Sequence, residues 1–322
     1  MNEPEKSRFA LSADDKPIVY AAFFVVLILA VGTAYTLQTQ GTATLLSPTY
    51  LLQQLQVGAF LGVVAAGMML VILLGHIDLS VPWTIAAAAM MATTVGGPMA
   101  IPVGLAVGLM VGLINGFGVA YLRIPSMIFT LGVNAVLRGL MVAHTGGFAP
   151  QTAATPLMQY LAVNKVAGVP VALIVWTVVS VGIVLLLTRS FLGRYIYAIG
   201  NREGAAYLAG VPTRRVIVVA FGLCGMLSGL AGTLLAGYST KAYQGMGDAY
   251  LLPAIAAVVI GGTHILGGRG RYIGTLLGVI LIVLLNSVLS IMQMPESGRQ
   301  IIYGSVIILM LLVYGRSHKV TQ

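Results

Sequence analysis

Apolar runs as long as a bilayer is thick recur along this chain and leave it few ways to fold. A helix needs about 20 apolar residues to cross a hydrocarbon layer of roughly 30 Å. Only 8% of the residues are charged, 58% are hydrophobic and the mean hydropathy is +0.98, whereas soluble domains average about 25% charged residues. The pattern therefore predicts an all-α, polytopic integral membrane protein.

We expect about ten transmembrane helices, two of them short. The runs lie near Ile18–Leu37, Leu51–Leu74, Val81–Val95, Met99–Val119, Ser126–Val142, Val171–Leu187, Val216–Gly237, Leu251–Ile265, Ile273–Met292 and Ile301–Tyr314. The longest connections, 143–170 and 188–215, are too short to hold a soluble domain. We therefore expect a single transmembrane domain over residues 1–322. Residues 1–17 do not resemble a cleaved signal peptide, because their charges are mixed.

The basic residues support this count. The formal charge of +9 could suggest nucleic-acid binding, but the Lys and Arg residues fall in the gaps between apolar runs, which instead indicates membrane topology. With the N-terminus inside, only Lys165, Lys241 and Arg299 fall outside, and Arg138 lies within a span. The thirteen inside are Lys6, Arg8, Lys16, Arg123, Arg189, Arg194, Arg202, Arg214, Arg215, Arg269, Arg271, Arg316 and Lys319. This split predicts that both termini are cytoplasmic and that the protein contacts membrane lipid.

The chain carries no signature of catalysis or of cofactor binding. No segment has the lysine and hydroxyl of a Walker A loop, so any ATP would be bound by another chain. The four histidines are scattered, and Cys224 is the single cysteine, inside an apolar run. We therefore expect no metal, no catalytic residue and no resident cofactor in this subunit.

Two glycine-containing interruptions indicate broken helices. In GHIDLSVPW, Gly75 and Pro82 interrupt the helix, and Asp78 or Ser80 can cap the next piece. A second interruption places seven glycines between Gly261 and Gly278. Broken backbone at membrane depth needs cover from protein or water, and in transporters such breaks bind or flex. A tight inner turn without function is the alternative for the second break.

The most distinctive connection is Thr188–Val216, which sets five arginines and Glu203 between two apolar runs. We interpret part of it as a short helix that lies along a partner subunit, with small residues forming a smooth docking surface and Arg202 and Glu203 adding charge beside it. A basic loop that only fixes topology is the alternative. The small residues are Gly204, Ala205, Ala206, Ala209 and Gly210.

Four segments in order resemble the permease of ribose-type monosaccharide ABC importers. They are GHIDLSVPW (75–83), IPSMIFTLGVNAVLRGL (124–140), GRYIYAIGNREGAAYLAGV (193–211) and AVVIGGTHILGGRGRYIGTLLG (257–278). The resemblance covers nearly the whole chain. It implies a ten-helix inner-membrane subunit that dimerises, receives sugar from a periplasmic binding protein and is driven by a separate cytoplasmic ATPase. It also implies that residues 188–215 hold the coupling helix.

The chain departs from the family pattern at a few positions. His76 stands where the family usually has a second glycine, and Pro82 where it has the last glycine of that motif. In the coupling segment the spacing from Gly200 to Gly210 is kept, with Glu203 one position early and Gly204 in the usual acidic place. Docking through Ala205, Ala206, Leu208 and Gly210 is still expected.

Two other functions fit the class. A proton-coupled secondary carrier would need ionisable relay groups within the spans, and Asp78 and Arg138 are almost the only ones. A branched-chain amino-acid ABC permease shares the broad plan, but its first motif should read like I-N-F-A-H-G. The HIDLS of this chain favours sugar.

A translocation pathway is predicted from polar residues at helical spacing. Asn134 and Arg138 lie on one helical face, which we expect to look into the protein because a charge facing lipid is costly. Asn286 and Ser290, with Gln293, form a second stripe. Both stripes are interpreted as bordering a path that binds sugar hydroxyls weakly. The alternative is that Arg138 ties helices together through backbone carbonyls or extends outward to the membrane surface.

Overall fold

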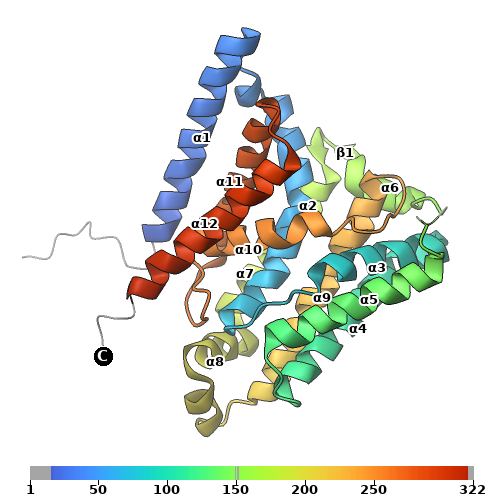
Figure 1. Ribbon diagram of the computed structural model, residues 1–322, viewed down its shortest axis with the longest axis vertical. Coiled ribbons are helices and arrows are strands. Elements are labelled where there is room, and N and C mark those ends of the chain that lie inside the picture. Colours follow the sequence, from blue (N-terminus) through green and yellow to red (C-terminus); the bar gives the residue numbers. More distant parts are fainter. Residues whose placement is uncertain (1–15, 149, 151, 318–322) are drawn as a thin grey trace, which may run out of the picture.

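The computed structural model describes residues 16–148, 150 and 152–317, and in that part the chain is almost entirely helical (Figure 1). The helices are α1 Lys16–Gln40, α2 Pro48–Leu73, α3 Val81–Val95, α4 Ala100–Ala120, α5 Ser126–Thr145, α6 Pro156–Val163, α7 Val171–Arg189, α8 Phe191–Leu208, α9 Thr213–Tyr238, α10 Leu251–Ile260, α11 Tyr272–Ile291 and α12 Glu296–Ser317. Short 3-10 turns are η1 Thr44–Leu46, η2 Gly97–Met99 and η3 Asp248–Tyr250. One small antiparallel hairpin pairs β1 Lys165–Val166 with β2 Val169–Pro170.

Seven described helices are long and apolar enough to cross a membrane, and two shorter apolar ones, Val81–Val95 and Asp248–Ile260, accompany them. The all-α prediction is confirmed, while the count of ten spans stays a prediction. The predicted span Leu251–Ile265 is too long: α10 ends at Ile260, because Gly261 packs on the backbone of Gly274 and Gly262 turns the chain at φ +91°. Sequence analysis also missed α6 and the hairpin within the connection 143–170.

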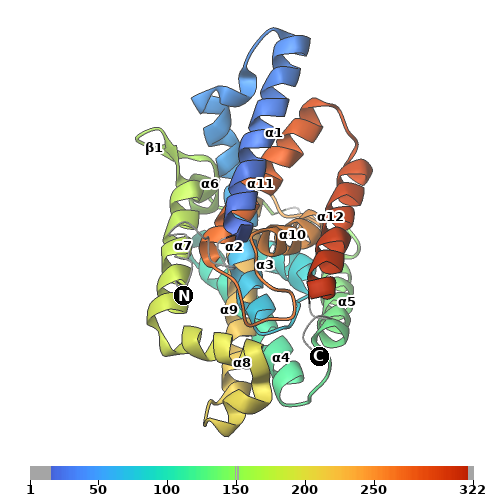
Figure 2. The ribbon, with the colours of Figure 1, turned by 90° about the vertical axis from the view of Figure 1, so that its left-hand side faces the viewer.

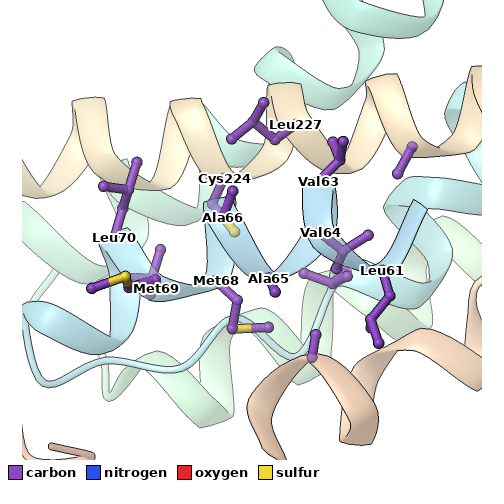
Figure 3. Close-up of a cluster of buried hydrophobic side chains, with 14 of the residues drawn as sticks. Leu61, Val63, Val64, Ala65, Ala66, Met68, Met69, Leu70, Cys224 and Leu227 are labelled. Atoms are coloured by element: carbon purple, nitrogen blue, oxygen red, sulfur yellow. The ribbon is translucent and has the colours of Figure 1, made fainter. Parts of the chain in front are cut away.

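Helix α2 forms the centre of the molecule. Its residues from Gly58 to Leu73 are all buried, because they are apolar on every side of the helix. Figure 3 shows Val63, Ala66 and Leu70 of α2 beside Cys224 and Leu227 of α9. The thiol of Cys224 is buried and unpaired, as expected for a packing residue.

Helices α4 and α9 pack most closely, through glycines spaced four apart on α4. A β-carbon on Gly108 would lie 2.9 Å from the Cα of Gly229, and one on Gly112 would lie 2.9 Å from the Cα of Gly222. Small residues permit such close contact between helices in lipid, where no hydrophobic force drives them together. These glycines of α4 are Gly104, Gly108, Gly112 and Gly116.

Helix α8 projects at one end of the molecule (Figures 1 and 2). The first turn of α1 and the last turn of α12 point toward the half that contains α8, whereas α1 ends and α2 begins at the opposite end. Residues 1–15 and 318–322, which include Lys6, Arg8 and Lys319, lie outside the described residues. The arrangement places the basic segment 188–215 at one extremity of the helical bundle.

Candidate functional site

The predicted coupling segment is a helix with a sharp bend. Ser190 begins α8, and its Oγ accepts a hydrogen bond from the amide of Gly193 at 3.1 Å. At Arg202 the backbone leaves the helical conformation, with φ −164° and ψ 98°. The bend separates residues 191–201 from a short terminal helix, 203–208. The predicted short helix in this segment is therefore present.

The short helix ends in a left-handed turn at Gly210. The Gly210 amide donates to the carbonyl of Tyr207 at 3.0 Å, and the Val211 amide donates to the carbonyl of Ala206 at 3.0 Å. This pair of hydrogen bonds is a Schellman motif, and it requires the φ of +83° that Gly210 adopts. Gly210 therefore shapes the segment as well as leaving its surface open.

The predicted docking surface needs one correction. Gly204, Ala205, Leu208 and Gly210 are exposed as expected, and the Leu208 side chain is 87% accessible. Ala206 is only 6% accessible and packs into the core of its own chain. A one-turn helix lying on the bundle must bury one face, and Ala206 is on it. Tyr207, 68% accessible, joins the exposed face instead.

An ion pair connects the segment 188–215 to the loop between α4 and α5. The guanidinium of Arg123 donates to the Glu203 carboxylate at 2.7 Å, and both side chains remain partly exposed. Sequence analysis did not pair these residues, because 80 positions separate them. His76 lies within reach of both: burial lowers the pKa of His76, the Glu203 charge raises it, and the Arg123 charge lowers it.

Both interruptions predicted from the glycines meet α8 at Gly200, just before its bend. Gly75 ends α2 in a second Schellman turn, with φ +80° and the His76 amide donating to the Val71 carbonyl at 3.1 Å. The Gly268 amide donates to the Leu73 carbonyl at 2.9 Å. A β-carbon on Gly200 would collide with that same carbonyl and with the Gly268 backbone. We call this meeting point of Leu73, Gly75, Gly200, Gly267 and Gly268 the glycine junction.

The non-helical segment 76–80 is held by a polar stripe on α5. The Ile77 amide donates to Ser126 Oγ at 3.4 Å, and the Leu79 amide donates to Thr130 Oγ1 at 2.9 Å. One step further, the Trp83 amide donates to Asn134 Oδ1 at 3.4 Å. Side chains thus satisfy backbone groups that a broken helix leaves unpaired. The signal that could have revealed this is the spacing of four, Ser126, Thr130, Asn134 and Arg138.

Asp78 anchors the break rather than capping α3 as predicted. Its Oδ1 accepts from the Ser80 amide at 2.9 Å, the Ser80 hydroxyl at 2.7 Å and the Asn115 side-chain amide at 3.2 Å. The Ser80 side chain does not cap the helix either. Asn115 of α4 was missed by sequence analysis, although it is fully buried in an otherwise apolar helix. Asp78 therefore ties the break to α4.

Arg138 lies at the far end of the α5 stripe on an exposed face. Its guanidinium carbon is 5.9 Å from the centre of the Trp83 ring, close enough for a cation–π contact. Sequence analysis missed Asp248 of η3. Burial raises the pKa of its carboxyl group, and the charge of Arg138 lowers it. The expected inward orientation holds for Asn134, which contacts α3, but it is wrong for Arg138 within the single chain, where that side chain is exposed because no described helix covers this part of α5.

Arg299 forms hydrogen bonds with both Asn286 and Ser290 of the second predicted stripe. Arg299 of α12 donates to Asn286 Oδ1 at 2.7 Å and to Ser290 Oγ at 2.9 Å, and it also pairs with Glu296 at 3.1 Å. Asn286 borders a cavity of about 130 Å³ that Tyr250, Glu296 and Tyr303 also line. The structure therefore does not join Asn286 and Ser290 to Asn134 and Arg138 in one site.

Within the described residues, no three His, Cys, Asp or Glu side chains group together as metal ligands would. Three features stand out in the described residues: an exposed short helix, a glycine junction behind it, and a helix break, braced by α5, that leads to Arg138.

Comparison with known proteins places these features in a family. Residues 50–311 match the family model described as branched-chain amino acid transport system / permease component. Ribose import permease protein RbsC of Escherichia coli (strain K12) is 35% identical over 271 residues, 82% of this chain and 84% of the relative. RbsC of Bacillus subtilis (strain 168) is 38% identical, covering 83% and 85%. Autoinducer 2 import system permease protein LsrD of Yersinia enterocolitica is 30% identical, covering 80% of each. No solved structure matches significantly.

Proposed function

We infer the function from one premise: this chain belongs to the family of branched-chain amino acid transport system permease components, and its similar relatives are sugar-import permeases. It is the permease subunit of an ABC importer for a sugar, in the ribose-type branch of that family. It is a transport component and not an enzyme. The branched-chain amino-acid alternative is not favoured, because the relatives at 35% and 38% identity import ribose.

As an ABC permease, the chain works with an ATPase and a substrate-binding protein as a multi-pass protein of the bacterial inner membrane. The exposed short helix 203–208 carries our proposal for coupling. Leu208 and Tyr207 present apolar surface at the extremity of the bundle, where lipid cannot cover a polar loop rich in arginine. These side chains dock in a groove of the ATPase, while the ion pair between Arg123 and Glu203 holds the helix to the bundle.

We further propose that both termini are cytoplasmic and that two copies of the chain form the complex. The thirteen-to-three split of basic residues supports the orientation. Helix α5 supports the dimer. Only 11% of its most apolar stretch is buried within one chain, and a helix that carries Arg138 needs cover from protein rather than from lipid. The α8 end of the molecule then faces the cytoplasm.

Two measurements test this function. In proteoliposomes that contain the permease with the ATPase and binding protein of the same transporter, labelled D-ribose, D-xylose, D-galactose or D-fructose should accumulate only when ATP is supplied. Uptake of leucine but of none of these sugars would contradict sugar import. In a Cys224→Ala background, Lys165→Cys should react with an impermeant thiol reagent in intact cells, and Gly204→Cys should not. The reverse labelling would overturn the orientation.

A further inference from the structure

The start of α3 brings two opposite charges into one region without an ion pair between them: Arg138 contacts Trp83, and the turn before Asp248 rests on Pro82. Arg138 of α5 is exposed, and apart from its contact with Trp83 the described residues give its guanidinium no hydrogen-bonded or ion-paired partner. Asp248 of η3 is exposed as well and lies within the electrostatic range of Arg138. Both charged groups therefore remain available to bind a third group.

The backbone brings these residues together where two short helices begin. A β-carbon on Gly247 would lie 2.8 Å from the Cα of Pro82, so the turn that carries Asp248 rests on the first turn of α3. Helix α10 starts directly after η3, at Leu251. The N-termini of α3 and α10 thus approach one another. Polar ligands in transporters bind where discontinuous helices present such ends.

The energetics exclude lipid as the neighbour of this face. An arginine in hydrocarbon is costly and normally pairs with an acid or with backbone carbonyls. Arg138 instead leaves its fork of donors open, although Asp248 stands nearby. An unpaired couple of this kind is stable only beside water or a polar molecule. We therefore place this face against an aqueous path, which the second permease copy encloses.

We propose that Arg138 and Asp248 bind the hydroxyl groups of the sugar as it passes through the permease. This inference rests on the proposed sugar import. A hydroxyl group can both donate and accept a hydrogen bond. The sugar O–H can therefore donate to the carboxylate of Asp248, while the guanidinium of Arg138 donates to the hydroxyl oxygen. Two such side chains bind a neutral, polyhydroxylated molecule without needing a charge on it. Contacts from only two groups also permit release.

Trp83 and Asn134 serve as positioning residues for this site. The Trp83 ring is only 6% accessible, so it cannot act as an open stacking surface for sugar. It instead lies under the guanidinium of Arg138. Asn134 accepts from the Trp83 amide and so fixes the start of α3 relative to α5. The polar stripe of α5 thereby ends in an oriented, unpaired arginine.

The test uses the complete transporter in proteoliposomes and the labelled sugar that the wild-type protein carries best among the four named above. Arg138→Ala and Asp248→Ala should each lower the maximal uptake rate about tenfold, equivalent to ~1.4 kcal/mol in the barrier. The ATPase rate stimulated by loaded binding protein should change by less than about twofold, because coupling is remote from this site. Lys241→Ala, which removes an exposed charge from the same connection, is the matched control and should transport normally.

Conservative variants separate binding from folding. Asp248→Asn keeps an acceptor and Arg138→Gln keeps donors, so both should fold and retain more uptake than the alanine variants. Uptake at the wild-type rate by the alanine variants would overturn the proposal, as would loss of stimulated ATPase in parallel with uptake. A wild-type protein that carries none of the sugars would instead contradict sugar import itself.

Discussion

Gly200 of α8 lies against the carbonyl oxygen of Leu73 at the end of α2, with no space for a β-carbon between them. The same carbonyl accepts the amide of Gly268 at 2.9 Å. Three segments that sequence analysis singled out separately therefore share one contact point. In the coupling proposed above, movement of α8 on the ATPase would reach the helix break and the second glycine-rich turn through this junction.

Gly200→Ala should uncouple the transporter. The added methyl group forces apart α8 and the end of α2, and overpacking of this kind typically costs about 1–3 kcal/mol. We expect ATPase activity that no longer responds to loaded binding protein, together with loss of sugar uptake. Gly182→Ala on α7 is the matched control, because it makes the same change in a helix outside the docking surface, with nothing within 4 Å. Equal behaviour of the two variants would show that the junction transmits nothing.

Leu208→Asp should weaken assembly with the ATPase and leave the permease stable. Leu208 is 87% accessible in the isolated chain, so a charge there disturbs only a partner's apolar surface. Ala206→Trp should behave in the opposite manner, with reduced thermal stability of the permease alone, because Ala206 is buried in its own chain. Co-purification of the ATPase and the melting temperature of the detergent-solubilised permease distinguish the two. Normal ATPase recovery with Leu208→Asp would remove this residue from the interface.

Asp78→Asn should retain most activity, and Asp78→Leu should lose it. An asparagine oxygen can still accept from the amide and hydroxyl of Ser80, while its NH₂ can donate to Asn115 Oδ1, which has no partner among the described residues. Leucine leaves these buried groups unsatisfied, at about 1–3 kcal/mol for each. Sugar uptake at equal expression measures the difference. If asparagine fails as badly as leucine, the charge itself is needed, and an ion-coupled mechanism gains support.

Gly108→Ala should destabilise the helical bundle. The methyl group would collide with the backbone of α9 at Gly225 and Gly229, which cannot move as a flexible side chain can. We expect a lower melting temperature and reduced membrane yield. Gly132→Ala on α5 makes the same change where no atom lies within 4 Å, and it should be neutral. A similar melting temperature for both variants would contradict close packing of α4 and α9.

The sequence by itself determined the properties that depend on local spacing. Apolar runs of fixed length predict the helices, Gly75 marks where a helix ends, and the bases of 188–215 mark the segment that is proposed to couple the chain to an ATPase. Each of these follows from a few neighbouring residues. The family resemblance added the expectation of an importer, and the comparisons confirmed it.

Only the tertiary structure decided which distant side chains meet. Periodicity placed Asn134 and Arg138 on one face, but it could not reveal that the turn carrying Asp248 packs on Pro82, next to the Trp83 ring that Arg138 contacts. It also could not show that Arg299 occupies the stripe of Asn286 and Ser290. A helical repeat fixes the face on which a residue lies, whereas its partner depends on how helices far apart in the chain pack together. The glycines of α4 and α9 set that packing, because they allow backbones to touch where any larger residue would hold them apart.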